Sequence, residues 1–197
     1  LPAFKGVDPV NNPRFVALVE HLRESSDGLF DLRVVSPTGE MRHVPNPTGR
    51  TLERVSGQDY VKIHLDRVSR ALYIGEPALS PHSGKWELPV SWPVNSNTAG
   101  VAILVAAVDV EMLAAAYEPL RTRPDGSIVL LRRDDRVLSR APFNPDFLGR
   151  SLRANTSLQI IRESQERATF TADSGSTDGV RRIASFERLE RYPLTVL

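Results

Sequence analysis

The first hundred residues alternate between apolar residues at helical spacing and short apolar runs separated by turn residues. Asn12 and Pro13 are typical of a helix start, and the following apolar residues fall at i, i+3, i+4 and i+7, which predicts a helix to about residue 25. Residues 30–35 are then expected to form a strand. A turn at residues 36–39 would lead to a return strand over residues 41–44.

A second helix is expected over residues 57–69, with Ser56 and Asp59 as its capping box. Residues 72–74 are expected to form a short strand. Residues 86–94 form a further predicted strand, and its prolines at positions 89 and 93 favour an edge or a bulge. The apolar, β-branched run from residue 100 to 108 is typical of a strand that is buried on both faces.

The same order of elements is repeated in the second half of the chain. Strands are predicted at residues 127–131 and 137–140, a loop at 141–155, and a helix that opens with a capping box at 156–159. Residues 170–172, 180–189 and 194–197 are the remaining predicted strands, and 173–179 form a flexible tip.

This order favours an α+β fold of two tandem modules, each a roughly five-stranded antiparallel sheet flanked by helices. The predicted modules span residues 1–122 and 123–197, and the N-terminal helix of the first is expected to be partial. The alternative is a single mixed domain of nearly 200 residues.

Composition and charge exclude several function classes. The 197 residues carry a formal net charge of +1 without a long block of like charge, which argues against a nucleic-acid partner. The absence of cysteine excludes disulfides and thiolate chemistry. The four histidines are scattered, so we expect no metal site, and no sequence motif for a catalytic residue or a cofactor is present.

Several segments together resemble the double Cache (PDC) sensor domain, a tandem of PAS-like modules. In the first half these are Asp59-Tyr60, His64, residues 72–77, 83–86 and 88–91, and the run 100–109 leading to Leu113 and Tyr117. In the second half they are residues 126–128, 140–142, 178–181 and 192–194. The chain lacks the Arg-x-Trp-Tyr run of the amino-acid-binding chemoreceptors in this family.

The resemblance implies the extracytoplasmic, ligand-sensing part of a bacterial inner-membrane receptor, either a histidine kinase or a diguanylate cyclase. Such a receptor would be anchored in the membrane and homodimeric, and it would signal to a cytoplasmic output domain across the membrane. This fragment would not itself be an enzyme, and its partner would be a small molecule of unknown identity. The alternatives are a PAS-like module that binds no small molecule and answers a periplasmic protein, and a hydrolase or other enzyme with a polar cluster in a cleft.

The distal, first module is the predicted place for the ligand. Its candidate pocket residues are Tyr60, His64, Tyr73, Trp86, Ser91, Trp92 and Asp109. Tyr60 and His64 are four residues apart and therefore share one side of a helix. Aromatic residues with Asp109 would suit a cationic head group. Each candidate also has a competing interpretation. The two tryptophans share a strand face and could be core residues, as could Tyr60. Asp109 could be a helix N-cap, and for this residue the N-cap is the favoured interpretation.

Overall fold

The computed structural model describes residues 9–45, 53–66, 68–94, 100–155, 158–163, 166–172 and 181–197. Its contacts divide the chain into two compact units. The first unit is Leu1–Gly75 with Glu87–Asp109, and the second is Glu76–Trp86 with Val110–Leu197. The predicted boundary between residues 122 and 123 stays a prediction. The predicted capping residues at 156 and 157 and the tip at 173–179 lie outside the described residues.

The first unit is built on an antiparallel sheet with the strand order β3-β2-β1-β7-β6-β4, and β5 pairs with β6 as a seventh strand. The helical elements up to this sheet's last strand are η2 (Pro9–Asn11), α1 (Pro13–Ser25) and α2 (Asp59–Leu65). The strands are β1 (Phe30–Val35), β2 (Glu40–His43), β3 (Glu53–Arg54), β4 (Tyr73–Ile74), β5 (Ala78–Leu79), β6 (Trp86–Pro93) and β7 (Ile103–Asp109).

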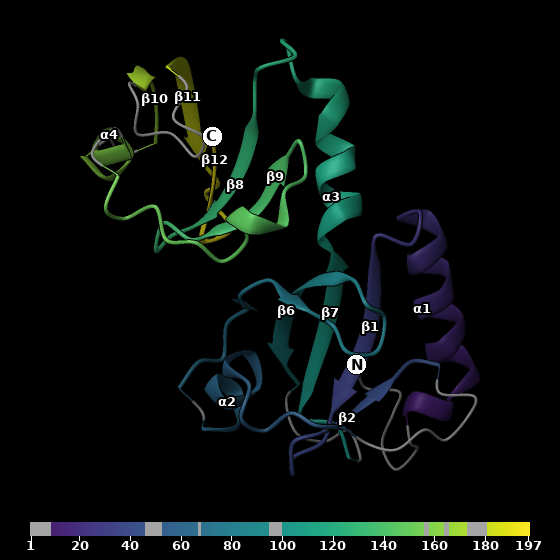
Figure 1. Ribbon diagram of the computed structural model, residues 1–197. Helices are drawn as coiled ribbons and strands as arrows, with labels where there is room; N and C mark the ends of the chain where they lie inside the picture. The colour runs from purple at the N-terminus through teal and green to yellow at the C-terminus, as the bar shows by residue number, and fades with distance from the viewer. Residues whose placement is uncertain are drawn as a thin grey trace. The chain divides into compact units, whose positions relative to one another are not determined.

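Helix α1 begins where the sequence predicts, and it lies beside β1 (Figure 1). The Oδ1 atom of Asn12 accepts hydrogen bonds from the backbone N–H groups of Arg14 at 3.0 Å and Phe15 at 3.3 Å. These bonds satisfy two donors that have no partner inside the helix. Phe15 and Val19 are buried in one core cluster with Val34 of β1. This cluster covers one face of the sheet.

Helix α2 covers the opposite face. Val61 is fully buried in a cluster with Val35, Ile103 and Val105, whose side chains alternate with those that face α1. The helix is shorter than predicted. The predicted capping box is wrong, because the N-cap residue is Gln58 and it makes no side-chain cap hydrogen bond.

Strand β6 is an internal strand, so the prediction that its prolines place it at an edge or a bulge is wrong. It pairs with β7 over seven residues in unbroken register and with β4 on its other side. The carbonyl of Pro89 accepts from the N–H of Gly75, so residue 89 directs its backbone polar groups toward β4. The absent N–H groups of Pro89 and Pro93 therefore point away from β7, and its ladder is not interrupted.

Gly39 in the turn between β1 and β2 has no room for a side chain. Its φ is +82°, and a Cβ atom would lie 2.5 Å from Cβ of Ser56. Gly39→Ala is therefore expected to lower the free energy of unfolding by about 2 to 4 kcal/mol, from left-handed strain and overpacking together. Gly28, with φ +74° and no atom within 4 Å of such a Cβ, is the matched control. Denaturant titration of Gly39→Ala and Gly28→Ala would contradict this interpretation if both variants lost the same stability.

The second unit holds a five-stranded antiparallel sheet in the order β10-β11-β12-β8-β9. Its helical elements are α3 (Val110–Tyr117), η3 (Glu118–Leu120), η4 (Pro145–Phe147) and α4 (Gln159–Glu163). Its strands are β8 (Ile128–Arg132), β9 (Val137–Ala141), β10 (Arg167–Ala172), β11 (Arg182–Arg188) and β12 (Leu194–Val196).

One face of this second sheet carries the core of the unit. Val129 and Leu131 of β8, Phe186 of β11 and Phe170 of β10 are buried together with Leu158 and Ile161, which come from the α4 region. No residue of this cluster belongs to the two clusters of the first unit. The predicted α+β class, with antiparallel sheets and flanking helices, is confirmed, although the first sheet has seven strands in place of about five.

Candidate functional site

The strand register places one row of side chains across five strands, on the sheet face that α2 covers. His43 pairs with Arg33, Arg33 with Val105, Val105 with Ser91, and Ser91 with Tyr73. Directly paired residues in an antiparallel sheet project to the same side. The row therefore joins four polar residues beneath one helix, although they lie far apart in the sequence.

His64 is fixed between α2 and this row. Its Nε2 atom lies 2.9 Å from Oγ of Ser91, and its Nδ1 atom lies 3.1 Å from the carbonyl oxygen of Ser69. The residue is 7% exposed, and Ser91 is fully buried. Because both ring nitrogens have protein partners, we interpret His64 and Ser91 as the pair that holds α2 in place over the sheet.

Tyr60 lies one helical turn before His64, on the same side of α2. It is half-buried against the cluster that contains Val61. Burial raises the pKa of its phenol, and the charges of Arg33, Glu53 and Glu87 act on it as well. Gly75, directly after β4, lets Pro89 and Tyr60 lie close to the backbone at this position. A Cβ atom on residue 75 would lie 2.7 Å from Cγ of Pro89 and 3.5 Å from Cβ of Tyr60.

A chain of charged groups crosses the same face. Nη2 of Arg33 lies 2.7 Å from Oε1 of Glu87, and Nε of Arg33 lies 3.4 Å from Oδ2 of Asp31. The same Asp31 oxygen lies 3.0 Å from Nδ1 of His43. The side chain of Arg33 is 8% exposed and that of Glu87 is 15% exposed, so this ion pair is largely removed from water.

Asp31 makes the stability contributed by these charged groups depend on pH. Partial burial acts to raise the pKa of Asp31, but the hydrogen bond from His43 and the charge of Arg33 outweigh it, so the pKa lies below its usual value. A carboxyl group whose pKa is lowered by folding stabilises the protein above its unfolded pKa of about 4, and this contribution is lost as the pH falls through the folded pKa.

We expect Asp31→Asn to lower the free energy of unfolding by less than about 1 kcal/mol at pH 7, because the side chain is 36% exposed and solvent screens its charge. The difference between the two proteins should shrink as the pH falls through the lowered pKa of Asp31, where the wild-type carboxyl becomes protonated. Thermal melts from pH 2 to 8 measure this, with the exposed α1 change Glu24→Gln as the control. A difference that does not change with pH would contradict it.

The end of the face nearest α3 adds a pair of carboxylates. Asp109, the last residue of β7, lies directly opposite Glu87, and it is 8% exposed. With Asp31, three carboxylates share the face with the guanidinium of Arg33 and the rings of Tyr60 and Tyr73. Carboxylates beside aromatic rings suit a ligand that carries a positively charged amine.

The structure does not bring the two tryptophans into this group. Trp92 pairs with Leu104, so it shares the α1 face of the sheet, and it is 51% exposed. Trp86 belongs to the second unit. The structure thus places Tyr60, His64, Tyr73, Ser91 and Asp109 on one face, while their role as ligand contacts stays a prediction.

Sequence analysis missed the charged members of the face, which are Asp31, Arg33, His43 and Glu87. In the strand pattern of β1 the two charged residues alternate with Leu32 and Val34. Such alternation is also typical of a strand with one solvated face. The two cases differ only in whether a helix covers that face of the sheet. The sequence does not show which face α2 covers, so it gave no signal for these charged residues.

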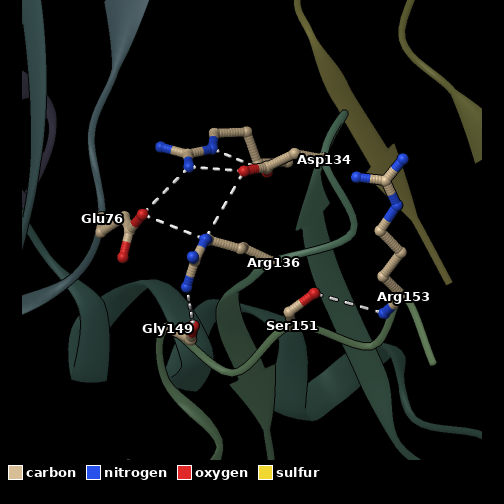
Figure 2. A network of polar contacts seen from close by, with 7 residues as sticks. Glu76, Asp134, Arg136, Gly149, Ser151 and Arg153 are labelled. Carbon is tan, nitrogen blue, oxygen red and sulfur yellow. Dashed lines mark hydrogen bonds and ion pairs between the residues drawn. The ribbon is translucent and has the colours of Figure 1, made fainter. Parts of the chain in front are cut away.

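A second polar network lies in the second unit and is structural (Figure 2). Oε1 of Glu76 lies 3.2 Å from Nη2 of Arg132 and 3.0 Å from Nε of Arg136, and Asp134 contacts both arginines. The hydrogen bond from Arg132 lowers the pKa of Asp134. Because the two carboxylates are 43% and 46% exposed, we interpret the network as a tie between residue 76 and the β8–β9 hairpin.

A metal site and a membrane-spanning helix are both absent from the part of the chain that the structure describes. It contains no group of three or more His, Asp or Glu side chains that could hold a metal ion. Among the same residues, no helix has the length and apolar character needed to cross a membrane.

Comparisons with known proteins agree with this architecture. No curated protein matches the sequence. Among solved structures, the extracellular domain assigned to the histidine kinase rpHK1S-Z16 superposes with a TM-score of 0.71 at 21% identity, over 94% of this chain and 76% of that one.

Two chemoreceptor domains are also similar. The ligand-binding domain of the Pseudomonas aeruginosa PAO1 amino acid chemoreceptor PctC, in complex with GABA, has a TM-score of 0.60 at 14% identity, over 99% of this chain and 84% of that one. The ligand-binding domain of the Pseudomonas fluorescens chemoreceptor CtaA, in complex with L-leucine, has a TM-score of 0.60 at 16% identity, over 95% of this chain and 78% of that one. At these identities the likeness shows the fold. A family model described as a histidine kinase sensor domain matches residues 111–197. The predicted resemblance is therefore confirmed: residues 111–197 match the model of the dCache_1-like histidine kinase sensor domains, and the fold is that of solved extracellular sensor domains.

Proposed function

We propose that the first unit binds a small organic molecule with a cationic amine, at the sheet face beneath α2. The observation that carries the proposal is the row of polar side chains that β1, β2, β4, β6 and β7 place on that face. Hydrophobic cores rarely contain so many charged groups unless these are paired or functional. The partly exposed Asp31 and His43 give the face a polar margin that a ligand can reach.

Other proteins of this fold support a small-molecule role. The similar PctC and CtaA domains were solved with GABA and with L-leucine, and both of these compounds carry an ammonium group. This chain lacks the amino-acid motif of such chemoreceptors, so we do not assign an amino acid as the ligand. The charge of the α2 face selects the amine and leaves the rest of the ligand open.

The sensor-domain match supports a place for this chain in a receptor. We infer that the chain lies outside the cytoplasm as part of a homodimeric inner-membrane protein, and that its output is a histidine kinase or a diguanylate cyclase. Ligand binding would shift an equilibrium between two arrangements of α2 on the sheet. A ligand can shift this equilibrium only by as much as its affinities for the two arrangements differ.

A thermal-shift screen of amines, amino acids and carboxylates against the purified chain tests this proposal. A ligand at 100 times its dissociation constant stabilises the folded state by about 2.7 kcal/mol, which raises the melting temperature by several degrees. The shift caused by an amine should disappear in Tyr60→Ala and in Asp109→Ala. Tyr192→Ala, a 48%-exposed tyrosine of the second unit, is the matched control and should retain it.

Two outcomes would contradict the proposal. A stabilising amine whose effect survives in both site variants would place the ligand elsewhere. A complete screen without any shift would favour the alternative module, which answers a periplasmic protein and binds no small molecule.

A further inference from the structure

Helix α2 is a small element with few anchors. It has seven residues, too few for an isolated helix to be stable in water, and its N-cap residue Gln58 makes no side-chain cap hydrogen bond. Two of its side chains are buried, the apolar Val61 and the polar His64. The position of the helix therefore depends on the contacts that these two side chains make.

The contact of His64 with the sheet is a directional hydrogen bond. A carbonyl oxygen can only accept, so in the neutral ring Nδ1, which lies 3.1 Å from the carbonyl oxygen of Ser69, carries the proton. In this tautomer Nε2 is an acceptor, and the hydroxyl of Ser91 donates to it at 2.9 Å. Ser69 follows α2 in the sequence, whereas Ser91 belongs to β6. The bond to Ser91 is therefore the one that joins the helix to the sheet.

The charged groups on the α2 face are largely closed off from water while the helix is in place. The side chains of Arg33 and Glu87 are 8% and 15% exposed, and Asp109, opposite Glu87, is 8% exposed. Arg33 and Glu87 lie close enough to Tyr60 of α2 for their charges to act on its phenol. An amine can therefore contact Glu87 only after the element above it has moved.

We propose that α2 is a lid over the row of polar side chains, and that the hydrogen bond from Ser91 to His64 is the latch that keeps this lid closed. Lifting α2 breaks this bond and withdraws Val61 from its cluster, whereas the pairing of β1, β6 and β7 does not involve the helix. Ser91 is then a positioning residue that acts through His64.

The role of the lid in ligand entry rests on the function proposed above, because that function places the amine beside Glu87. If only the open state admits the ligand, the apparent affinity is reduced by the fraction of molecules that are open. The latch therefore sets how strongly an amine of given chemistry binds, without itself touching the amine.

Amide hydrogen exchange of the protein without ligand tests the latch directly. The N–H groups of Lys62 and Asp66 bond to the carbonyls of Gln58 and Lys62, so they exchange when α2 opens locally. Ser91→Ala leaves Nε2 of His64 buried without a donor, a loss that shifts a local equilibrium by about tenfold or more. Exchange at Lys62 and Asp66 should accelerate by that factor, while the amides of β7 keep their wild-type rates.

Two matched variants separate the hydrogen bond from the mere loss of a buried hydroxyl. Ser139→Ala also removes a fully buried serine hydroxyl, but this one has no hydrogen-bond partner among the described residues, so exchange in α2 should not change. The double variant Ser91→Ala with His64→Leu removes donor and acceptor together and should restore most of the slow exchange in α2. Ser69 is only half-buried, so water can satisfy its carbonyl in this variant. A double variant that exchanges as fast as Ser91→Ala would overturn the proposal.

Carboxylate labelling with a carbodiimide and glycine ethyl ester, followed by mass spectrometry, tests what the lid covers. The amine of this probe must reach Glu87 for a product to form. Ser91→Ala should raise the labelling rate of Glu87 by about the same tenfold factor as exchange in α2. The exposed Glu187 of β11 should label equally in both proteins. Unchanged labelling of Glu87, or exchange that accelerates equally in α2 and β7, would overturn the proposal.

The wild-type protein supplies an independent measurement that needs no variant to fold. A lid requires Lys62 and Asp66 to exchange faster than the amides of β7, and equal rates would mean that α2 opens only when the whole unit unfolds. These results are separate from the ligand screen. A latch that passes each test in a protein that no amine stabilises would keep the lid and remove the proposed function.

Discussion

Replacing Arg33 with methionine is expected to lower the free energy of unfolding by about 3 to 5 kcal/mol, the usual cost of removing one partner of a buried ion pair. The guanidinium of Arg33 lies 2.7 Å from Glu87, and both side chains are largely buried. The substitution therefore leaves the carboxylate of Glu87 buried beneath α2 without its closest cation. Urea titration followed by circular dichroism measures the loss.

Two further variants show whether charge is the cause. The double variant Arg33→Met with Glu87→Leu should recover most of the lost stability, because neither charge then remains in the buried site. Arg14→Met, an exposed change on α1, should alter stability by less than about 0.5 kcal/mol. A double variant no more stable than Arg33→Met would show that lost packing, and not the unpaired carboxylate, destabilises the protein.

Phe186→Ala is the second change with a large expected effect. Phe186 is 3% exposed at the centre of the second unit's core, with its ring centroid 6.5 Å from that of Phe170. Removing such a side chain typically costs about 3 to 5 kcal/mol. Since the two units have separate core clusters, amide hydrogen exchange should become faster in β8, β11 and β12 and stay nearly unchanged in β1 and β7.

The control for this change lies on the same strand. Ile183→Ala shortens an apolar side chain of β11 that is 80% exposed, and it should change stability by less than about 0.5 kcal/mol. Equal loss of protection in both sheets of Phe186→Ala would contradict the prediction, since it would mean that the two cores unfold as one.

Local sequence signals predicted most of the elements. Asn12 and Pro13 set the start of α1, and the β-branched run after Gly100 predicted the central strand β7, because both signals act through neighbouring residues. The prolines of β6 misled the prediction. A proline is excluded from an internal strand only when its N–H would face a partner, and that direction depends on register.

The candidate site was predicted only in part for a related reason. Tyr60 and His64 share a helix side by spacing alone, so the sequence places them together. Arg33 and Glu87 are separated by more than fifty residues, and only the pairing of β1, β7 and β6 brings them into contact. Trp92 was included in the predicted group because it lies on the same predicted strand as Ser91, although consecutive residues of a strand face opposite sides of the sheet.

The most direct measurement of the central claim is an amide NMR titration of the ¹⁵N-labelled protein with a stabilising amine. We expect the largest chemical-shift changes in α2 and in the α2-facing residues of β1 and β6. These changes should saturate, and the dissociation constant from their half-saturation should equal the one found by calorimetry. Saturable changes confined to the second unit, with α2 and β1 unaffected, would contradict the assignment of the ligand to the α2 face.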